Sequence, residues 1–278
     1  MNKRWLRLIA TLAAPVAFAQ SGPTAPPVFD VASIRACQNG GSSAKNSPGR
    51  LAVSCFSLRK LIQDAYEIFA TGQVDPRNPS FPTMPIEGAP AWLDSESYTI
   101  EAVTNAPASV PMMRGPMMRA LLEDRFHLSL HRETREVPVY ALTQSKAGAK
   151  LTPSQPGSCV PITAGEFLTP RKFAPGDPPY CAATPPHRQG DLFIWNVRGI
   201  DLDLFCSLIH IDRPVVNRTG LTGLFDIDLK WESENPADGG PGGSLMEAIR
   251  AQLGLHLDPA TGPREFLVID HIERPTGN

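Results

Sequence analysis

Two pairs of side chains in this sequence have a spacing that suits metal binding or acid–base chemistry. His127 and His131 lie four residues apart, the spacing of two zinc ligands on one face of a helix. They fall in a strand-like alternation, however, and no glutamate follows His127, so a solvated polar face is the favoured interpretation. Asp226 and Asp228 also alternate with apolar residues, which predicts the outward face of a strand. As paired carboxylates they remain candidates for acid–base work or cation binding.

No other pattern supplies a complete catalytic or cofactor site. The sequence contains no Gly-x-Ser-x-Gly, so a serine hydrolase of that type would lack its nucleophile elbow. Cys206 lies in a helical apolar pattern, which predicts a buried and inert thiol. The glycine-rich run 239–243 lacks the lysine of a phosphate-binding loop. We therefore expect no catalytic residues, no metal ligands and no cofactor.

The segment 213–223 is the densest group of polar and glycine residues between two expected elements. Binding residues tend to gather on such turns. The structural alternative is that Gly220 and Gly223 supply positive-φ turn positions while the polar groups satisfy the backbone of the turn. The binding candidates are Arg213, Asn217, Arg218 and Thr219, together with Trp92, which falls on Thr219 when the two halves of the chain are aligned.

The elements that position these residues follow from an internal repeat. When the chain is shifted by 127 residues, apolar residues near the end of the first half fall on apolar residues near the end of the second. The register covers about 45 positions, which indicates two copies of one folding unit. The aligned residues are Leu122, Phe126, Leu128, Leu130, Val139, Tyr140 and Leu142 on Ile249, Leu253, Leu255, Leu257, Phe266, Leu267 and Ile269.

Each copy is predicted to be a β-α-β-α-β-β unit, an α+β fold with helices packed on small mixed sheets. Ser57 and Asp201 are expected to cap the first helix of each copy. In copy one we expect strands at 29–34 and 98–103, helices at 58–66 and 113–124, and a closing hairpin of 126–131 with 137–144. In copy two we expect strands at 192–197 and 224–231, helices at 202–210 and 245–253, and a hairpin of 255–257 with 265–272.

The first helices align at a different shift, 144 residues, because copy one carries an extra Pro-rich excursion at 72–85. The predicted organisation is a signal peptide at 1–19, a first copy at 28–146, a Pro-rich connection at 147–190 and a second copy at 191–274.

The amino terminus predicts export to the periplasm or the medium. Lys3, Arg4 and Arg7 precede an apolar run at 8–18, and a small-residue cleavage site follows at 17–19. No later stretch approaches the roughly 20 apolar residues of a membrane helix, so we expect no integral membrane segment after cleavage. The net charge of −2, with scattered basic residues, argues against nucleic acid as a partner.

Five cysteines in an exported chain predict disulfides. Cys37 and Cys55 flank a polar loop, and Cys159 and Cys181 flank the Pro-rich connection. We expect Cys37–Cys55 and Cys159–Cys181, with Cys206 as a free thiol, although four cysteines allow three connectivities.

Several motifs resemble one bacterial family. They are FDVASI at 29–34, GAPAWL at 88–93, LLEDRF at 121–126, EVPVY at 136–140 and DRPVVNRTGLTG at 212–223. These motifs are similar to those of the soil-associated, acidobacterial-type family of exported proteins of unknown function, over nearly the whole mature chain. The resemblance implies a domain that also occurs attached to sensor-type membrane metallopeptidases, and it implies no established activity. Asn217 stands where an aspartate is usual, which argues against a required carboxylate there.

The element order of copy two also resembles the short N-terminal domain of secretins and TonB-dependent receptors. That resemblance implies a protein-interaction module of the cell envelope, and a likeness of fold is only associational evidence about function.

These observations predict an exported, non-enzymatic module that binds a partner protein or an envelope component. One alternative is a hydrolase or cell-wall-modifying enzyme with a site between the copies, using Asp226, Asp228 or His131. A second alternative is an extracytoplasmic sensory domain for a small ligand, suggested by the family's attachment to membrane peptidases.

Overall fold

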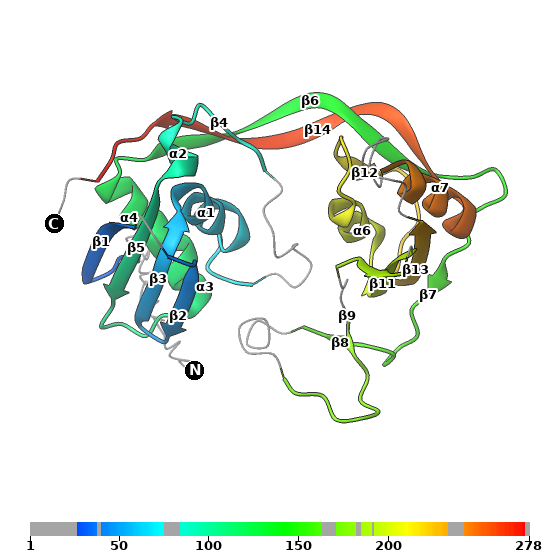
Figure 1. The fold of residues 1–278 in the computed structure, drawn as a ribbon, viewed down its shortest axis with the longest axis horizontal. Helices are drawn as coiled ribbons and strands as arrows, with labels where there is room; N and C mark the ends of the chain where they lie inside the picture. The colour runs from blue at the N-terminus through cyan, green and yellow to red at the C-terminus, as the bar shows by residue number, and fades with distance from the viewer. Residues whose placement is uncertain are drawn as a thin grey trace, which may run out of the picture.

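A computed structural model describes residues 27–37, 40–74, 84–162, 171–181, 185–190, 192–232 and 242–275. The chain is α+β, as predicted, and forms two lobes joined by a long two-stranded ribbon (Figure 1). The expected signal peptide at 1–19 lies outside the described residues. So do residues 75–83 of the Pro-rich excursion and 163–170 and 182–184 of the connection between the copies.

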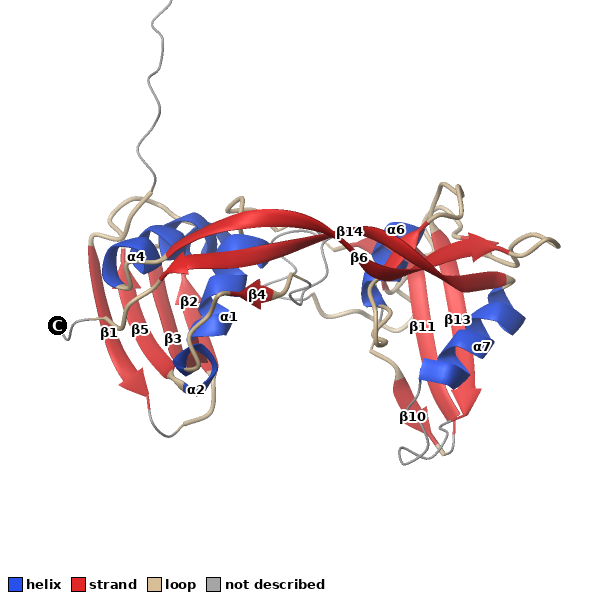
Figure 2. Cartoon of the chain, turned by 90° about the horizontal axis from the view of Figure 1, so that it is seen from above, coloured by secondary structure: helices blue, strands red, loops and turns tan. Residues whose placement is uncertain are grey.

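The first lobe is a four-stranded antiparallel sheet of order β1-β5-β3-β2 with helices packed against it (Figure 2). The strands of this sheet are β1 (Val31–Cys37), β2 (Ser43–Ser47), β3 (Arg50–Ser57) and β5 (Ser97–Val103), and the short strand β4 (Ile86–Glu87) lies outside it. Its helices are α1 (Leu58–Gln63), the π-helix η1 (Asp64–Ile68), α2 (Trp92–Ser95), α3 (Val110–Met112), the π-helix η2 (Met113–Met117) and α4 (Met118–Arg125).

The second lobe has a sheet of order β10-β11-β13-β7, which packs with α6 and α7. The elements are β7 (Thr152–Pro153), β10 (His187–Gln189), β11 (Leu192–Ile200), α6 (Leu202–Leu208), β12 (Val215–Asn217), β13 (Phe225–Glu232) and α7 (Gly242–Leu253). The connection adds a small parallel pair, β8 (Val160–Pro161) with β9 (Tyr180–Cys181).

The two lobes share their strand order. β5 lies between β1 and β3, and β13 lies between β7 and β11, so β11 occupies the place of β3 rather than that of β1. β3 and β11 also carry a bulge at the same point, where Cys55 and Gly199 have φ values of 52° and 61°. The 144-residue shift places Cys55 on Gly199. The origin of both lobes from one duplicated unit remains a prediction.

Both bulges lie beside a disulfide. Cys55 is bonded to Cys37 within the first lobe. In the second lobe Cys159 is bonded to Cys181, and a Cβ added at Gly199 would collide with the Cys159 Sγ. The second disulfide, which joins two residues of the Pro-rich connection, therefore packs directly against β11.

The helix caps follow the sequence pattern. The Ser57 side chain accepts a hydrogen bond from the Lys60 N–H at 3.3 Å at the start of α1. The Asp201 side chain accepts one from the Leu204 N–H at 2.8 Å at the start of α6. Each cap satisfies a backbone donor that the first turn of a helix leaves unpaired, so both predicted helix starts are confirmed.

The predicted closing hairpins are wrong. β6 (Ser129–Gln144) and β14 (Leu255–His271) are single long strands that pair antiparallel along nearly their whole length. The first half of β6 pairs with the second half of β14 in one lobe, and the remaining halves pair in the other. Leu130 faces Ile269, and Leu257 and Leu142, which the predicted 127-residue shift matches to them, also face each other. The exchange thus preserves the 127-residue register.

Prolines at the centre of the ribbon explain why the sequence indicates turns there. The Leu267 N–H donates to the carbonyl of Pro85, the residue just before β4, so the backbone N–H at this position of β14 points away from β6. Pro259 and Pro263 share its parity along β14, and the alternation of an antiparallel ladder turns their nitrogens to the outer edge. A proline is tolerated where its missing N–H would face outward on an edge strand. The same residues discourage further strands from pairing along these open edges.

The hydrophobic cores cross the predicted domain boundaries. Leu267 and Ile269, from the second half of the sequence, are buried in the core of the first lobe. Leu142, from the first half, is buried in the core of the second. Each of the two cores therefore contains residues from both predicted copies, 28–146 and 191–274.

A buried ion pair joins the two π-helices of the first lobe. The Asp64 side chain on η1 is 4% exposed and pairs with Arg114 of η2 and with Lys60. The two helices approach closely because position 115 is glycine, where a Cβ would collide with the Phe69 carbonyl oxygen.

We expect Arg114→Met to destabilise the first lobe by about 1–3 kcal/mol, because it removes one of the two cationic partners of the buried Asp64 carboxylate. Urea unfolding would measure the loss. Arg125→Met is the matched control: Arg125 pairs with Asp124 at the surface and should cost less than about 1 kcal/mol. Equal effects of the two variants would contradict a special role for the buried pair.

A chain truncated after Gly262 should lose the first lobe and keep the second, because it lacks Leu267 and Ile269. Hydrogen exchange should show β5 unprotected and β13 still protected, with a chain ending at Arg274 as the control. If each copy closed with its own hairpin, the truncation would instead expose β13.

Candidate functional site

A pocket of about 470 Å³ lies in the second lobe, beside the centre of the ribbon. One wall is the end of α6 and the loop that leads to β12. The opposite wall is residues 263–265 of β14, and Met84, just before β4, closes one side. Elements of the second lobe, the ribbon and the first lobe thus meet at this site.

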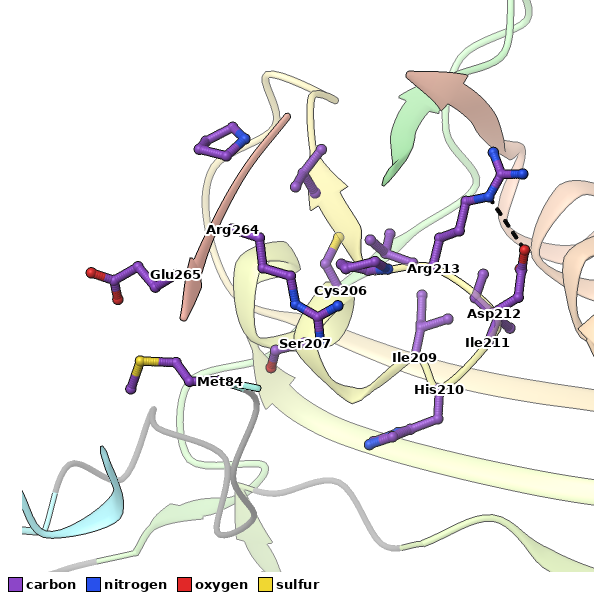
Figure 3. A pocket seen from close by; sticks show the side chains of 14 residues that line it. Met84, Cys206, Ser207, Ile209, His210, Ile211, Asp212, Arg213, Arg264 and Glu265 are labelled. Atoms are coloured by element: carbon purple, nitrogen blue, oxygen red, sulfur yellow. Dashed lines mark ion pairs between the residues drawn. The ribbon is translucent and has the colours of Figure 1, made fainter. Parts of the chain in front are cut away.

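Side chains from two walls converge in the pocket (Figure 3). Arg264 reaches from β14 toward Ser207 on α6, and His210 lies below them on the loop. Arg213 and Asp212 lie on the far side and pair with each other, with Arg213 Nε 3.3 Å from Asp212 Oδ2.

Arg213 is the one predicted binding residue among those that line the pocket. Its guanidinium lies over the Tyr140 ring, 5.3 Å from the centroid, as well as beside Asp212. These contacts hold the charged end against the ribbon, so the stem of the side chain contributes more to the wall than the charge does.

Asn217 and Thr219 stabilise their own turn. Asn217 Oδ1 accepts hydrogen bonds from the Thr219 N–H at 3.0 Å and the Thr219 hydroxyl at 2.8 Å. Thr219 Oγ1 then accepts one from the Leu221 N–H at 3.1 Å, and the Thr219 carbonyl accepts one from Gln144 Nε2 at 2.7 Å. Both residues thus satisfy the backbone of the turn, which is the alternative to binding that the sequence analysis gave. A binding role for them remains a prediction.

Arg218 and Trp92 also have intramolecular partners. Arg218 Nη2 donates to the Thr261 carbonyl on β14 at 2.7 Å and so ties the turn to the ribbon. Trp92 begins α2 in the first lobe, where the Arg274 guanidinium lies 4.8 Å from its ring centroid. Trp92 does not line the pocket, so the structure does not bring the five candidates into one site.

The residues of the hydrolase alternative lie in separate surface contacts. His131 Nδ1 is 3.0 Å from Asp270, and both side chains are about half exposed. Asp228 accepts a hydrogen bond from Arg198 Nη2 at 2.7 Å, and Asp226 Oδ1 accepts one from the Gly199 N–H at 2.9 Å. Asp226 thus holds the β11 bulge.

Ser207, His210 and Asp212 line one pocket but do not form a catalytic triad. The Ser207 hydroxyl donates to the Leu204 carbonyl at 2.7 Å, and His210 Nδ1 lies 2.8 Å from the Leu208 carbonyl. Asp212 pairs with Arg213 rather than with the imidazole. A triad requires the serine and the acid to contact the same histidine.

Within the described part of the chain, no group of three or more His, Cys, Asp or Glu side chains is placed to hold a metal ion. No described helix is long and apolar enough to cross a membrane.

A model of the protein family described as protein of unknown function (DUF3738) matches residues 59–272. The chain belongs to this family. No curated protein and no solved structure matches it. The match covers the second lobe, the ribbon, every residue that lines the pocket and the part of the first lobe that follows β3.

Sequence reasoning missed Arg264, His210 and Ser207. Under the predicted shifts of 127 and 144 residues, Arg264 falls on Val137 and His210 falls on Tyr66, so a polar residue stands opposite an apolar or aromatic one at both places. These departures from the repeat are the signal that could have identified the site.

In the first lobe, the residues that the 144-residue shift matches to the pocket loop are helical. Its helical segment continues from α1 through η1 to Ile68, and η1 residues 64–68 are buried. Glu67 Oε1 accepts a hydrogen bond from the Met84 N–H at 3.1 Å, which holds η1 to the start of β4. In the second lobe α6 ends at Leu208, and a loop takes the place of the extra turn. This difference leaves room for the pocket.

Burial and the nearby Asp203 and Asp201 raise the pKa of the Cys206 thiol to about 12. Ellman's reagent at pH 8 should therefore detect no thiol in the native protein and one in guanidinium. A count of three or more in unreduced, denatured protein would contradict the two disulfides. Because folding raises this pKa above the value of about 8.5 for a free cysteine, the associated stability is present below pH 8.5 and is lost toward pH 12.

Proposed function

We propose that this chain is an exported, non-enzymatic binding module that holds an envelope component in the pocket between α6, β12 and β14. The observation that supports the proposal is the pocket itself, whose volume of about 470 Å³ falls in the range of small-molecule sites. Ile209, Val215 and Pro263 provide apolar walls, and a few polar side chains converge on the interior. The sequence predicts either a partner protein or an envelope component as the ligand. A small envelope component, or a group that projects from a larger one, suits this volume better than the surface of a protein.

Export is supported by the disulfides Cys37–Cys55 and Cys159–Cys181, because disulfides persist in oxidising compartments outside the cytoplasm. The signal-like sequence at 1–19 supports the same location.

A sensory domain for a small ligand is the second candidate. It is favoured by Met84, which brings the first lobe to a pocket otherwise built from the second lobe and the ribbon. A ligand that contacts both sides would favour one arrangement of the lobes over others, which is the physical basis of a sensor. The hydrolase alternative has less support, because Asp226, Asp228 and His131 each have a separate partner.

Ser207→Trp should abolish binding, because the indole would fill the pocket from α6. Both proteins would be made without residues 1–19, immobilised and exposed to an envelope extract. The Ser207→Trp variant should retain at least tenfold less of the component that the unsubstituted protein binds. Mass spectrometry would quantify it.

Asp203→Trp is the matched control, since it places the same side chain on an exposed position of α6 outside the pocket. Equal recovery by the two variants would refute the pocket as the binding site. Near-ultraviolet circular dichroism would check that both variants remain folded.

A further inference from the structure

We propose that the outer edge of β1 pairs with β1 of a second copy of this chain, which joins the sheets of two first lobes into one continuous sheet. β1 is the last strand on one side of its sheet, and within the described part of the chain it pairs only with β5. It lies on the side of the first lobe away from the second lobe (Figure 2). The interface is therefore distinct from the pocket, which lies in the second lobe beside the ribbon.

The backbone of β1 presents hydrogen-bonding groups along this outer edge. The Asp30 N–H donates to the Val103 carbonyl at 2.9 Å, so Val103 directs its carbonyl toward β1. Val103 faces Val31, and in an antiparallel ladder the backbone groups of successive residues alternate between the two sides of a strand. Every second residue of β1 therefore directs its N–H and carbonyl groups away from β5. These outward residues are Ala32, Ile34 and Ala36. A row of this kind is a template for a further strand.

The other sheet edges that the structure describes are shorter or blocked. Under the predicted 127-residue shift, Val103 corresponds to Lys230 on β13, and here the Gln252 carboxamide of α7 takes the place of a strand. It accepts the Lys230 N–H at 3.2 Å and donates to the Lys230 carbonyl at 2.6 Å. Prolines lie along the ribbon, and the remaining edge strands have five residues or fewer, with Lys45 on β2. β1 has seven residues and no proline, so it is the edge best suited to pairing.

The register of β1 is complementary to itself, which favours a second copy as the partner. The outward residues are placed symmetrically about Ile34, at the centre of the strand. An antiparallel pairing about a two-fold axis would set Ile34 opposite Ile34 of the second copy, and Ala32 opposite Ala36. All three outward residues would then exchange hydrogen bonds in a single register. A two-fold contact of this kind uses the same patch on both copies and closes as a dimer.

The side chains on the solvent face of β1 fit the same register. Arg35 would lie opposite Ser33 of the second copy rather than opposite another Arg35, and like charges directly opposite are the destabilising case. Arg35 is also within 3.9 Å of Glu101 in its own sheet. Val31 is 68% exposed, the largest fraction among the large apolar side chains of the described residues. Pairing would place Val31 opposite Cys37 of the second copy and cover it with that copy's disulfide.

Sedimentation equilibrium of the protein lacking residues 1–19 would test the dimer. The contact of two single strands is smaller than the roughly 1,200 Å² of a standard stable interface, so we expect a reversible equilibrium. The dissociation constant should lie in the micromolar range. A protein that stays monomeric up to about 1 mM would overturn the proposal.

Amide hydrogen exchange would identify the strand that forms the contact. The outward amides of Ala32, Ile34 and Ala36 should exchange more slowly as the protein concentration rises and dimers form. The amides of Ser33 and Arg35 face β5 and should be protected at every concentration. Protection of the outward amides only after addition of an envelope extract would assign this edge to a strand of another protein and refute self-pairing.

Ala36→Pro should raise the dissociation constant of the dimer at least tenfold. It removes an N–H that β5 does not use, and the side chain is exposed. Ala44→Pro is the matched control, because Ala44 is an exposed alanine on β2, the opposite edge of the same sheet. Ser47 and Arg50 close the two-residue turn of the hairpin, so the Ala44 N–H also faces outward. Equal dimerisation of the two variants would overturn the assignment to β1.

Val31→Lys is a second variant that leaves the core untouched, since this side chain is exposed. A lysine on the edge opposes pairing, so this variant should also weaken the dimer. Unchanged protection of β5 amides would show that each variant is folded. Ser207→Trp should dimerise like the unsubstituted protein, because Ser207 lies in the other lobe. Loss of the dimer in Ser207→Trp but not in Val31→Lys would count against the interface.

Discussion

The backbone ladder between β6 and β14 is the interaction on which the rest of the structure depends. Each lobe is closed by one half of each strand, so neither core is complete without residues from the other half of the sequence. The ladder also provides the edges onto which β4 and β12 add in parallel, one in each lobe. The pocket lies where these two short strands begin, because the centre of the ribbon is left uncovered there.

The sequence predicted the positions of individual helices and strands better than it predicted which strands pair with one another. Hydrophobic periodicity and capping residues located both first helices, since a serine or aspartate at Ser57 or Asp201 acts within its own turn. An alternating strand has the same pattern whichever strand it pairs with, and turn-forming residues at Pro259 and Pro263 locally favour a hairpin. The exchange is a nonlocal choice, made by the burial of Leu142 and Leu267 in opposite lobes, and it has no local signature.

The candidate site shows the same contrast between local features, which the sequence predicts, and nonlocal contacts, which it does not. Residues with turn chemistry, such as Asn217 and Thr219, were recognised from their types, and in the structure that chemistry serves the turn itself. Arg264 and His210 had no motif, because the pocket forms from segments that the fold alone brings together. Their only trace in the sequence is a mismatch between the two halves, which becomes informative once the lobes can be compared element by element.

The exchange of strand halves reverses the order in which the lobes can be completed during synthesis. The last residue that packs with the second core is Leu257, whereas the first core still lacks Leu267 and Ile269 at that point. Domains usually fold from the amino terminus as the chain emerges. Here the half that is made first cannot complete its core until Leu267 and Ile269, near the end of the chain, have been made. The amino-terminal lobe is therefore the last to close.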